Sequence, residues 1–254
     1  MKKRQYQELY DLEETYWWFV GRRALARQMV ERHAGRQGLR LLDAGCGTGG
    51  TLSRMGGLGE LHGLDFSPYA LAFTRQRGFD LLAVGDLTAM PYRPGSFDAV
   101  LSCDVLEHLG DDRGGLAEMA RVLRPGGHVV LTLPAHQFLW SEHDEALDHR
   151  RRYSARQVRA MLQEAGLDVV KLSPVVTAAF LPILFFRLMQ RLRRRRPDEP
   201  KTDLRVLPWP LNSLLIAILS VENWWLRFGN LPVGTSLVAV GRKPVSDAVK
   251  SSES

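Results

Sequence analysis

The sequence predicts a doubly wound α/β domain, in which helices cover both faces of a mostly parallel sheet. Between residues 39 and 170, short apolar runs alternate with amphipathic segments, which is typical of repeated strand–helix–strand units. Several of these runs are almost continuously apolar, as expected of parallel strands that are buried on both faces. The first run ends in a glycine-rich loop, and open sheets of this class bind ligands at that edge.

The individual elements follow in chain order from the same patterns. Residues 5–34 are expected to form one or two helices, and Pro68 after Ser67 marks the first turn of a later helix. Strands are expected at 39–44, 61–65, 81–84, 97–103, 128–133, 167–172 and 234–241, and helices at 51–55, 68–77, 113–123 and 155–164.

Domain boundaries are expected where this alternation begins and ends. We interpret residues 1–36 as N-terminal lid helices, 37–174 together with 234–244 as the main domain, 175–233 as an apolar helical insertion, and 245–254 as a disordered tail. The first residues are charged and lack the apolar segment of a signal peptide.

Composition limits the class of protein and the kind of partner. The chain has 254 residues, of which 45% are hydrophobic, so a full core can form. The net charge of +6 indicates an anionic partner, such as nucleic acid, a membrane surface or an acidic substrate. The basic runs 149–152 and 191–196 could instead be solvated faces. The only cysteines, Cys46 and Cys103, suggest no disulfide framework, in agreement with a reducing cytoplasm.

The strongest functional signal is the loop that follows the first expected strand. Asp43 ends the strand, and the loop that follows contains Gly45, Gly47 and Gly49, which allow a sharp turn and close contact between main chain and ligand. A dinucleotide-binding fold would use a similar loop. Asp65 ends the next strand, where a carboxylate can accept hydrogen bonds from ribose hydroxyls.

Further motifs follow along the chain that a dinucleotide-binding fold does not require. Asp86 follows the third strand, and residues 90–92 and 96–98 read Met-Pro-Tyr and Ser-Phe-Asp. Together with the glycine loop, this set resembles the class I S-adenosylmethionine-dependent methyltransferases, specifically the methyltransferase type 11 group, over residues 39–133. The resemblance implies a Rossmann-like sheet of seven strands in the order 3-2-1-4-5-7-6, with the last strand antiparallel.

The resemblance also implies a role for each residue that matches. The methionine and ribose parts of the cofactor would be lined by Asp43, Gly45, Cys46 and Gly47, and Cys103 with Asp104 would lie beneath the methionine part. Asp65 would hold the ribose hydroxyls. Phe66 would pack against adenine, and Asp86 would accept a hydrogen bond from the adenine amino group beside the main chain of Leu87.

The aromatic run 16–19 has two interpretations. It packs a helix on the sheet, or it forms a lid over cofactor and substrate, as in some bacterial members of the group. In the second interpretation Trp17 belongs to the cofactor site, and Arg22 or Arg23 lies near the methionine carboxylate.

Acid–base chemistry is expected in the polar loop 134–153, at the same edge of the sheet. Methyl transfer to oxygen needs alignment and a base, and histidine titrates near neutrality. We rank His143 with Asp144 first, then His149, then His136. Alternatively, His149 and Tyr153 brace the loop, while Arg151 or Arg152 pairs with carboxylates.

A metal site is not predicted. The string 104–108 resembles the Glu-x-x-Glu-His string of ubiquinone-biosynthesis O-methyltransferases, which is associated there with a divalent metal. Here Asp104 replaces the first glutamate, and the Glu-His pair also occurs in metal-independent relatives. We therefore expect His108 to border the pocket and Glu107 to cap or orient it.

The insertion suggests a surface that binds an apolar partner. Its runs 175–189 and 211–226 are shorter than the ~20 residues that cross a bilayer, and they are flanked by tryptophan and arginine. These features favour an interfacial anchor on an anionic membrane, with a homodimer interface or a substrate cap as alternatives.

These observations together predict O-methylation of a lipophilic or lipid-linked small molecule, by a cytoplasmic protein on the inner face of the cell membrane. An RNA methyltransferase, a soluble small-molecule methyltransferase and a non-catalytic binding scaffold are the alternatives. The arginines adjoin apolar helices rather than an RNA-binding module, so we expect no nucleic-acid partner.

Overall fold

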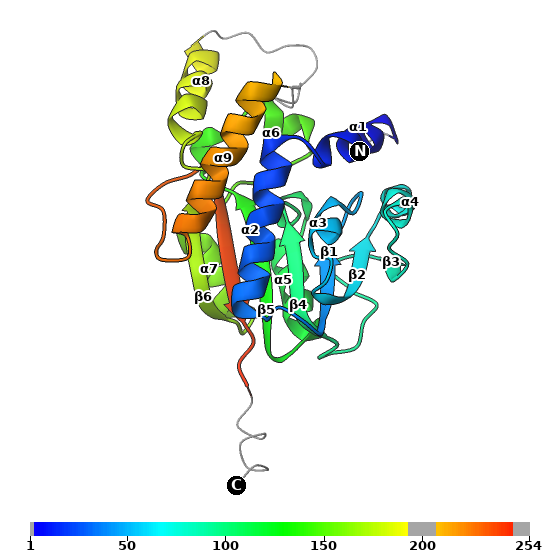
Figure 1. Cartoon of the computed structure of the whole chain (residues 1–254). Coiled ribbons are helices and arrows are strands. Elements are labelled where there is room, and N and C mark those ends of the chain that lie inside the picture. The colour runs from blue at the N-terminus through cyan, green and yellow to red at the C-terminus, as the bar shows by residue number, and fades with distance from the viewer. Residues whose placement is uncertain (1–2, 193–206, 246–254) are drawn as a thin grey trace.

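Seven strands form one mixed sheet in a computed structural model that describes residues 3–192 and 207–245 (Figure 1). The strand order is β3-β2-β1-β4-β5-β7-β6, and β7 is antiparallel to both of its neighbours, β5 and β6. The order predicted from the sequence is therefore confirmed. The strands are β1 Leu39–Ala44, β2 Gly59–Asp65, β3 Leu82–Val84, β4 Phe97–Cys103, β5 Leu123–Pro134, β6 Asp168–Val175 and β7 Ser236–Arg242.

Helices cover both faces of this sheet. The α-helices are α1 Lys3–Glu13, α2 Trp17–His33, α3 Gly50–Arg54, α4 Pro68–Gln76, α5 Asp112–Val122, α6 Glu142–Ala146, α7 Ala155–Glu164, α8 Phe180–Leu192 and α9 Trp209–Trp225, and the 3₁₀ turns are η1 Leu106–His108 and η2 Gln137–Leu139. Alternate residues of β1 enter opposite cores. Leu41 packs with α2 and α3, whereas Leu42 packs with α5 and α7. Burial on both faces explains the almost continuous apolar runs of the strands.

Local capping sets several helix starts. The Ser67 hydroxyl accepts a hydrogen bond from the Ala70 amide at 3.3 Å, and Pro68 occupies the first turn of α4, as predicted. The Asp111 carboxylate accepts from the Gly114 amide at 2.8 Å and starts α5 one residue before the predicted position. Helices α4 and α5 therefore begin at well-defined positions near the sheet edge at which β1, β2, β4 and β5 end.

The N-terminal segment forms two helices, α1 and α2. Helix α2 lies across one face of the sheet beside α9, and α1 lies near α4 at the carboxyl edge (Figure 1). Helices α8 and α9 belong to the segment between β6 and β7. Most of the predicted arginine run 191–196 and the predicted tail from residue 246 onward lie outside the described residues. None of the described helices is long and apolar enough to cross a membrane.

Candidate active site

The glycine loop turns at the end of β1 through left-handed backbone. The φ angles of Gly45, Gly47 and Gly49 are 87°, 54° and 85°, a region that side chains other than glycine rarely adopt. A Cβ atom at Gly45 would lie 2.6 Å from the nearest methyl of Val105. The loop is therefore closely packed on the side of Val105, and its main chain remains available to a ligand on the opposite side.

Two buried carboxylates flank this loop. Asp65 accepts hydrogen bonds from the amides of Gly47 and Ser67, both at 2.9 Å, so it holds the loop against the end of β2. Asp43 is only 1% exposed, and its Oδ2 has no hydrogen-bond partner among the described residues. Burial raises the pKa of Asp43 to about 7, although Arg22 opposes the shift. An orphaned buried oxygen is costly, so this position fits a polar group of a ligand.

The residues expected around adenine lie along the same edge. Phe66 is 73% exposed and Leu87 is buried, while the Asp86 carboxylate accepts from the amide and the hydroxyl of Thr88. Cys46 is buried in the loop, and burial raises the pKa of the Cys103 thiol to about 12. Cys103 is therefore a neutral thiol rather than a nucleophile at neutral pH.

A contact that the sequence did not reveal ties α1 to the glycine loop. Glu13, at the end of α1, accepts from the Thr48 hydroxyl at 2.7 Å and pairs with Arg77 at 3.0 Å. Arg23 donates to the carbonyls of Glu13 and Gly50 from the opposite side. The partners are far apart in sequence, and no local pattern marks them. Helix α1 is consequently attached directly to the loop.

Of the two arginines proposed for the methionine carboxylate, Arg22 is the one that faces the end of β4. It forms an ion pair with Asp104, whose backbone has a φ of 54°. Burial opposes charging of Arg22, but Asp104 more than offsets it and raises the pKa of Arg22. With Trp18 these residues line a cavity of about 20 Å³. The amide of Trp17 donates to the Asn212 side chain at 2.9 Å, which connects the start of α2 to α9.

The polar loop after β5 contains an aspartate–histidine pair. Asp144 is fully buried and contacts His149 Nδ1 at 2.9 Å and Arg152 Nε at 2.8 Å. Burial alone would raise the pKa of Asp144, but the His149 hydrogen bond and the Arg152 charge together lower it to about 2. Asp144 is therefore ionised, and it orients the His149 ring.

Part of this loop is a structural brace, as the alternative interpretation held. Arg151 pairs with Asp112 at 2.8 Å, and the Tyr153 hydroxyl donates to the same carboxylate at 2.8 Å. Arg152 pairs with Asp144. The loop is therefore attached to the start of α5, so the ring of His149 has a fixed position.

On its other side, the ring of His149 lies near the buried carboxyl group of Glu107. The rings of His108 and His149 are 4.8 Å apart, and one ligand atom each of Glu107, His108 and His149 lies within 4.8 Å of the others. Glu107 is fully buried, and neither of its oxygens has a hydrogen-bond partner in the described part of the chain, so the expectation that it caps or orients His108 is wrong. Burial, and secondly Asp104, raise the pKa of Glu107 well above its usual range.

The comparisons with known proteins agree with this geometry. Residues 42–131 match the family described as "Methyltransferase domain". This segment contains the glycine loop, Asp65 and Asp86, and the sheet has the strand order that the resemblance implied. The chain carries a class I S-adenosylmethionine-dependent methyltransferase domain.

Relatives of this domain include two bacterial proteins. A "Probable S-adenosylmethionine-dependent methyltransferase" of Mycolicibacterium smegmatis is 30% identical over 162 residues, which are 62% of each chain. A demethylmenaquinone methyltransferase of Beutenbergia cavernae is 37% identical over 107 residues, which are 41% of this chain and 45% of the relative. The chain thus spans less than two thirds of the length of either relative.

A solved structure shares the fold of the chain. A Haloferax volcanii chain, solved together with the Trm112 methyltransferase activator, superposes with a TM-score of 0.61 at 21% identity and covers 95% of both chains. At this identity the likeness shows the fold alone. The cofactor of the family is S-adenosylmethionine, and the orphaned oxygen of Asp43 beside the glycine loop fits the amino group and hydroxyls that this molecule carries.

Proposed function

We propose that this methyltransferase transfers the methyl group of S-adenosylmethionine to an oxygen atom of a lipophilic or lipid-linked small molecule at an anionic membrane surface. Two observations carry the proposal: an Asp144–His149 pair in the loop after β5 and an exposed apolar surface on α8 and α9. The first feature supports acid–base chemistry, and the second supports an apolar acceptor. His136 and Phe138 of the loop after β5 contact Phe180 at the start of α8.

The cofactor would be held by the three acidic strand ends and the loop. Both oxygens of Asp65 already accept one amide each, and their remaining lone pairs suit the two ribose hydroxyls. Phe66 offers an exposed ring for adenine, and Asp86 with Leu87 would lie at the edge of the adenine ring. Arg22 would exchange part of its contact with Asp104 for the methionine carboxylate.

S-adenosylmethionine supplies an already activated methyl group. The protein must align the acceptor, exclude water and remove a proton from a hydroxyl nucleophile. Because the ionised Asp144 holds Nδ1 of His149, the ring can present Nε2 as a proton acceptor. His143, which we ranked first from the sequence, lies on α6 one residue before Asp144. We now propose it second, after His149, because Asp144 contacts the His149 ring.

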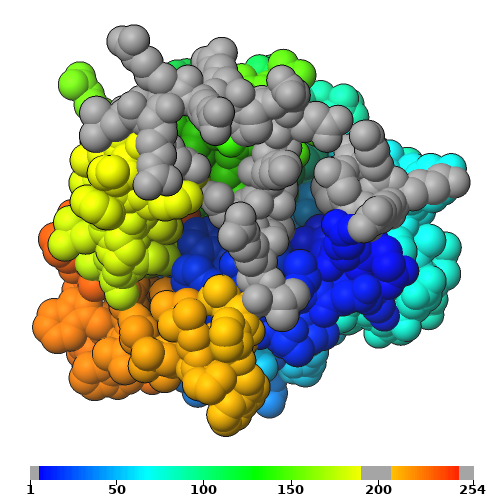
Figure 2. Space-filling view, turned by 90° about the horizontal axis from the view of Figure 1, so that it is seen from above, coloured from blue at the N-terminus to red at the C-terminus, as the bar shows by residue number. Residues whose placement is uncertain are grey.

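An apolar surface adjoins this site. Exposed large apolar side chains lie along α8 and α9. They are Leu181, Phe185, Phe186, Leu188, Met189, Trp209, Leu211, Leu214, Val221, Trp224 and Trp225, each at least 36% exposed. The first half of α9 lies beside α8 at the end of the molecule where the strands end (Figure 1 and Figure 2). An apolar surface with tryptophans supports insertion into the interface of a bilayer.

Vesicle flotation tests the membrane part of this proposal. The full chain should float with vesicles that contain phosphatidylglycerol, and Phe185→Asp with Leu214→Asp should abolish flotation. Leu81→Asp, at an exposed position before β3, is the control and should float normally. Retained flotation of the double variant, or a concentration-dependent dimer that the variant loses, would favour the homodimer interface instead.

Methyl transfer is tested with radiolabelled S-adenosylmethionine and cell extracts. Label should appear in the organic phase of a lipid extract, and mild base should not release it if an ether has formed. Label in the aqueous phase alone would support a soluble acceptor.

We propose that the reaction needs no metal, although Glu107, His108 and His149 could hold one. We predict that incubation with EDTA leaves the rate of methyl transfer unchanged, because His149 already has an ionised partner in Asp144. The measurement is the initial rate before and after chelation. A loss of activity that Zn²⁺ or Mg²⁺ restores would instead identify this cluster as a metal site.

A further inference from the structure

Glu13 places a carboxyl group where two local effects disfavour one. It is the last residue of α1, and an acidic side chain at the C-terminal end of a helix opposes the helix dipole. Its side chain is also buried, and this burial raises the pKa of the carboxyl group, although Thr48 and Arg77 oppose the shift. Neither its own helix nor solvent therefore explains an acid at this position, so the explanation lies in its contacts with other elements.

The partners of Glu13 meet at Thr48, the residue between Gly47 and Gly49 of the glycine loop. The Thr48 hydroxyl donates to the Glu13 carboxylate at 2.7 Å, and Nη2 of Arg77 donates to the same carboxylate oxygen at 3.0 Å. Nε of Arg77 also donates to the Thr48 carbonyl at 2.8 Å. Because Thr48 is fully buried, these contacts fix both the side chain and the main chain of the loop at this residue.

A second set of contacts brings the end of α1 against the start of α3. Arg23 of α2 donates to the main-chain carbonyls of Glu13 and Gly50, the latter at 3.0 Å. Gly50 begins α3 directly after the loop, and a Cβ atom there would lie 2.5 Å from the Glu13 carboxylate. Helix α1 therefore approaches this part of the loop as closely as the absence of a side chain at Gly50 permits.

Polar contacts rather than a shared core hold α1 in place. None of the described side chains of α1 belongs to either of the two hydrophobic cores that flank the sheet. Its apolar contacts are few: Tyr6 is buried, and the ring of Tyr10 lies 5.2 Å from the ring of Phe73. A segment of this kind separates from the rest of a protein at a low cost in free energy. The docked position of α1 therefore depends strongly on Glu13 and its partners.

The loop that α1 holds also presents the groups expected to bind the cofactor. The Gly47 amide donates to Asp65 at 2.9 Å, and the Gly47 carbonyl accepts from the Thr74 hydroxyl at 2.8 Å. Gly47 is thus held by β2 and α4, and the next residue, Thr48, is held by α1. Because Gly47 and Thr48 share a peptide group, a displacement of Thr48 also moves the main chain that faces the ligand.

We infer that Glu13 is a positioning residue for the cofactor, and that docking of α1 and binding of S-adenosylmethionine strengthen each other. Glu13 acts through Thr48. Docked α1 holds the loop in its binding conformation, and bound cofactor in turn holds α1 docked, because the coupling between two equilibria is reciprocal. The inference does not depend on the acceptor, so its failure is distinct from a failure of the proposed transfer to oxygen.

Calorimetric titration of the full chain with S-adenosylhomocysteine tests the contact at Thr48. Thr48→Val removes the hydroxyl and leaves the shape of the side chain nearly unchanged, so we expect at least about tenfold weaker binding. Thr48→Ser retains the hydroxyl and should bind within about twofold of wild type, since the hydrogen bond to Glu13 can still form. Equal weakening in both variants would overturn the inference.

Removal of the carboxyl group is the complementary test. Glu13→Ala should weaken binding about as much as Thr48→Val, and both changes together should weaken it about as much as either alone, because each removes the same contact. Asp11→Asn, at an exposed position on the same helix, removes an equal charge and should bind like wild type. Losses that add in the double variant would show that Glu13 does not act through Thr48.

Hydrogen exchange of the α1 amides separates positioning from a purely structural role. Saturating S-adenosylhomocysteine should slow exchange in α1 of the wild-type chain, and it should slow it less in Thr48→Val. A purely structural Glu13 would lower the free energy of unfolding when removed, without changing this dependence on ligand. The inference is overturned if the ligand binds wild type but leaves exchange in α1 unchanged, or if Thr48→Val binds as tightly as wild type.

Discussion

Asp144 shows how neighbouring groups decide the state of a buried carboxylate. Its burial disfavours charge, yet His149 and Arg152 reverse the effect and lower its pKa to about 2, below the ordinary value of 3.8. This difference corresponds to about 2 kcal/mol of folding free energy. Because the folded-state pKa is the lower one, that contribution is present above pH 4 and is lost as the pH falls toward 2.

We therefore predict that Asp144→Asn is destabilised by about 2 kcal/mol at pH 7, and that its difference from wild type shrinks between pH 4 and 2. Urea unfolding at a series of pH values measures both quantities. Asp168→Asn, at an exposed position, is the control and should follow wild type throughout. A constant difference across this range would contradict an ionised Asp144.

His149 is predicted to affect turnover rather than cofactor affinity. If it removes the proton from the acceptor, His149→Ala should lower kcat by about 10²- to 10⁴-fold. The dissociation constant for S-adenosylhomocysteine should remain unchanged, because His149 lies outside the glycine loop. Steady-state kinetics with calorimetry separates the two effects. An unchanged kcat with reduced stability would show that His149 only braces the loop.

At the scale of elements, α2 and α9 cross at a glycine. Gly21 is buried, and a Cβ atom there would overlap the side chain of Leu219, which is itself buried. The Asn223 side chain also donates to the Gly21 carbonyl at 3.1 Å. The close approach of the two helices thus depends on the absence of a side chain at this position.

We predict that Gly21→Val destabilises the protein by about 1–3 kcal/mol through overpacking. Leu219→Ala in the same chain should recover part of the loss, because it removes the atoms that the new side chain meets. The free energies of unfolding of both single variants and the double variant form the test. Strict additivity would mean that the two residues do not meet.

The strands were predictable because their signals are local. Glycine, proline or an acidic residue marks the ends of β1, β2 and β4. Because the strands are buried on both faces, their sequences are apolar runs. Helix ends moved by a residue or two, as between the predicted 113–123 and the observed Asp112–Val122, since capping depends on one side chain.

Contacts between distant elements were not predictable in the same way. Glu13 meets Thr48, and Asp144 meets His149, whereas the ranking from the sequence grouped Asp144 with His143. Nothing in the sequence states how α1 is placed on the loop or how the chain folds back after α6.

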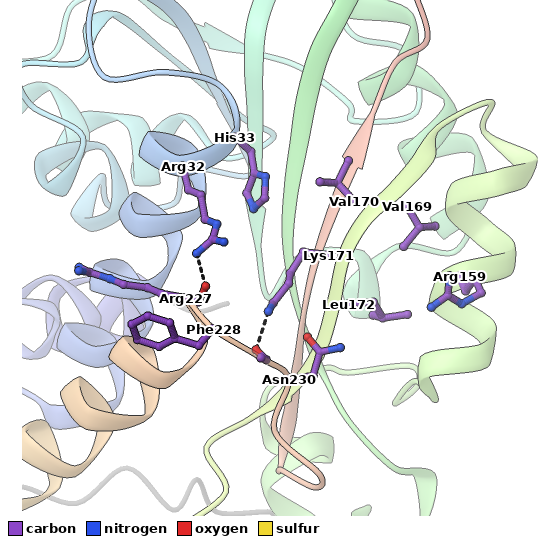
Figure 3. Close-up of a pocket in the computed structure, with 11 residues that line it drawn as sticks. Arg32, His33, Arg159, Val169, Val170, Lys171, Leu172, Arg227, Phe228 and Asn230 are labelled. Carbon is purple, nitrogen blue, oxygen red and sulfur yellow. Dashed lines mark hydrogen bonds between the residues drawn. The ribbon is translucent and has the colours of Figure 1, made fainter.

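At the scale of the whole molecule, the two ends of the sheet have separate chemistry. The carboxyl edge carries the glycine loop, the acids and the histidines, with the apolar surface of α8 and α9 beside it. A pocket lined by Arg32, Lys171 and Arg227 lies toward the opposite end, where α2 finishes (Figure 3). Helix α2 spans this distance, since Arg22 contacts the candidate active site and Arg32 lines the pocket.

The central claim is that Asp65, Asp43 and the glycine loop bind the adenosine of S-adenosylmethionine. Calorimetric titration with S-adenosylhomocysteine, the stable product, tests it most directly. We predict one site per chain in the wild type and at least about a hundredfold weaker binding by Asp65→Ala, which loses charge-assisted hydrogen bonds to ribose. Glu60→Ala, an exposed acid on the same strand, should bind like wild type. Absence of binding by the wild type, or equal affinity in Asp65→Ala, would contradict the account.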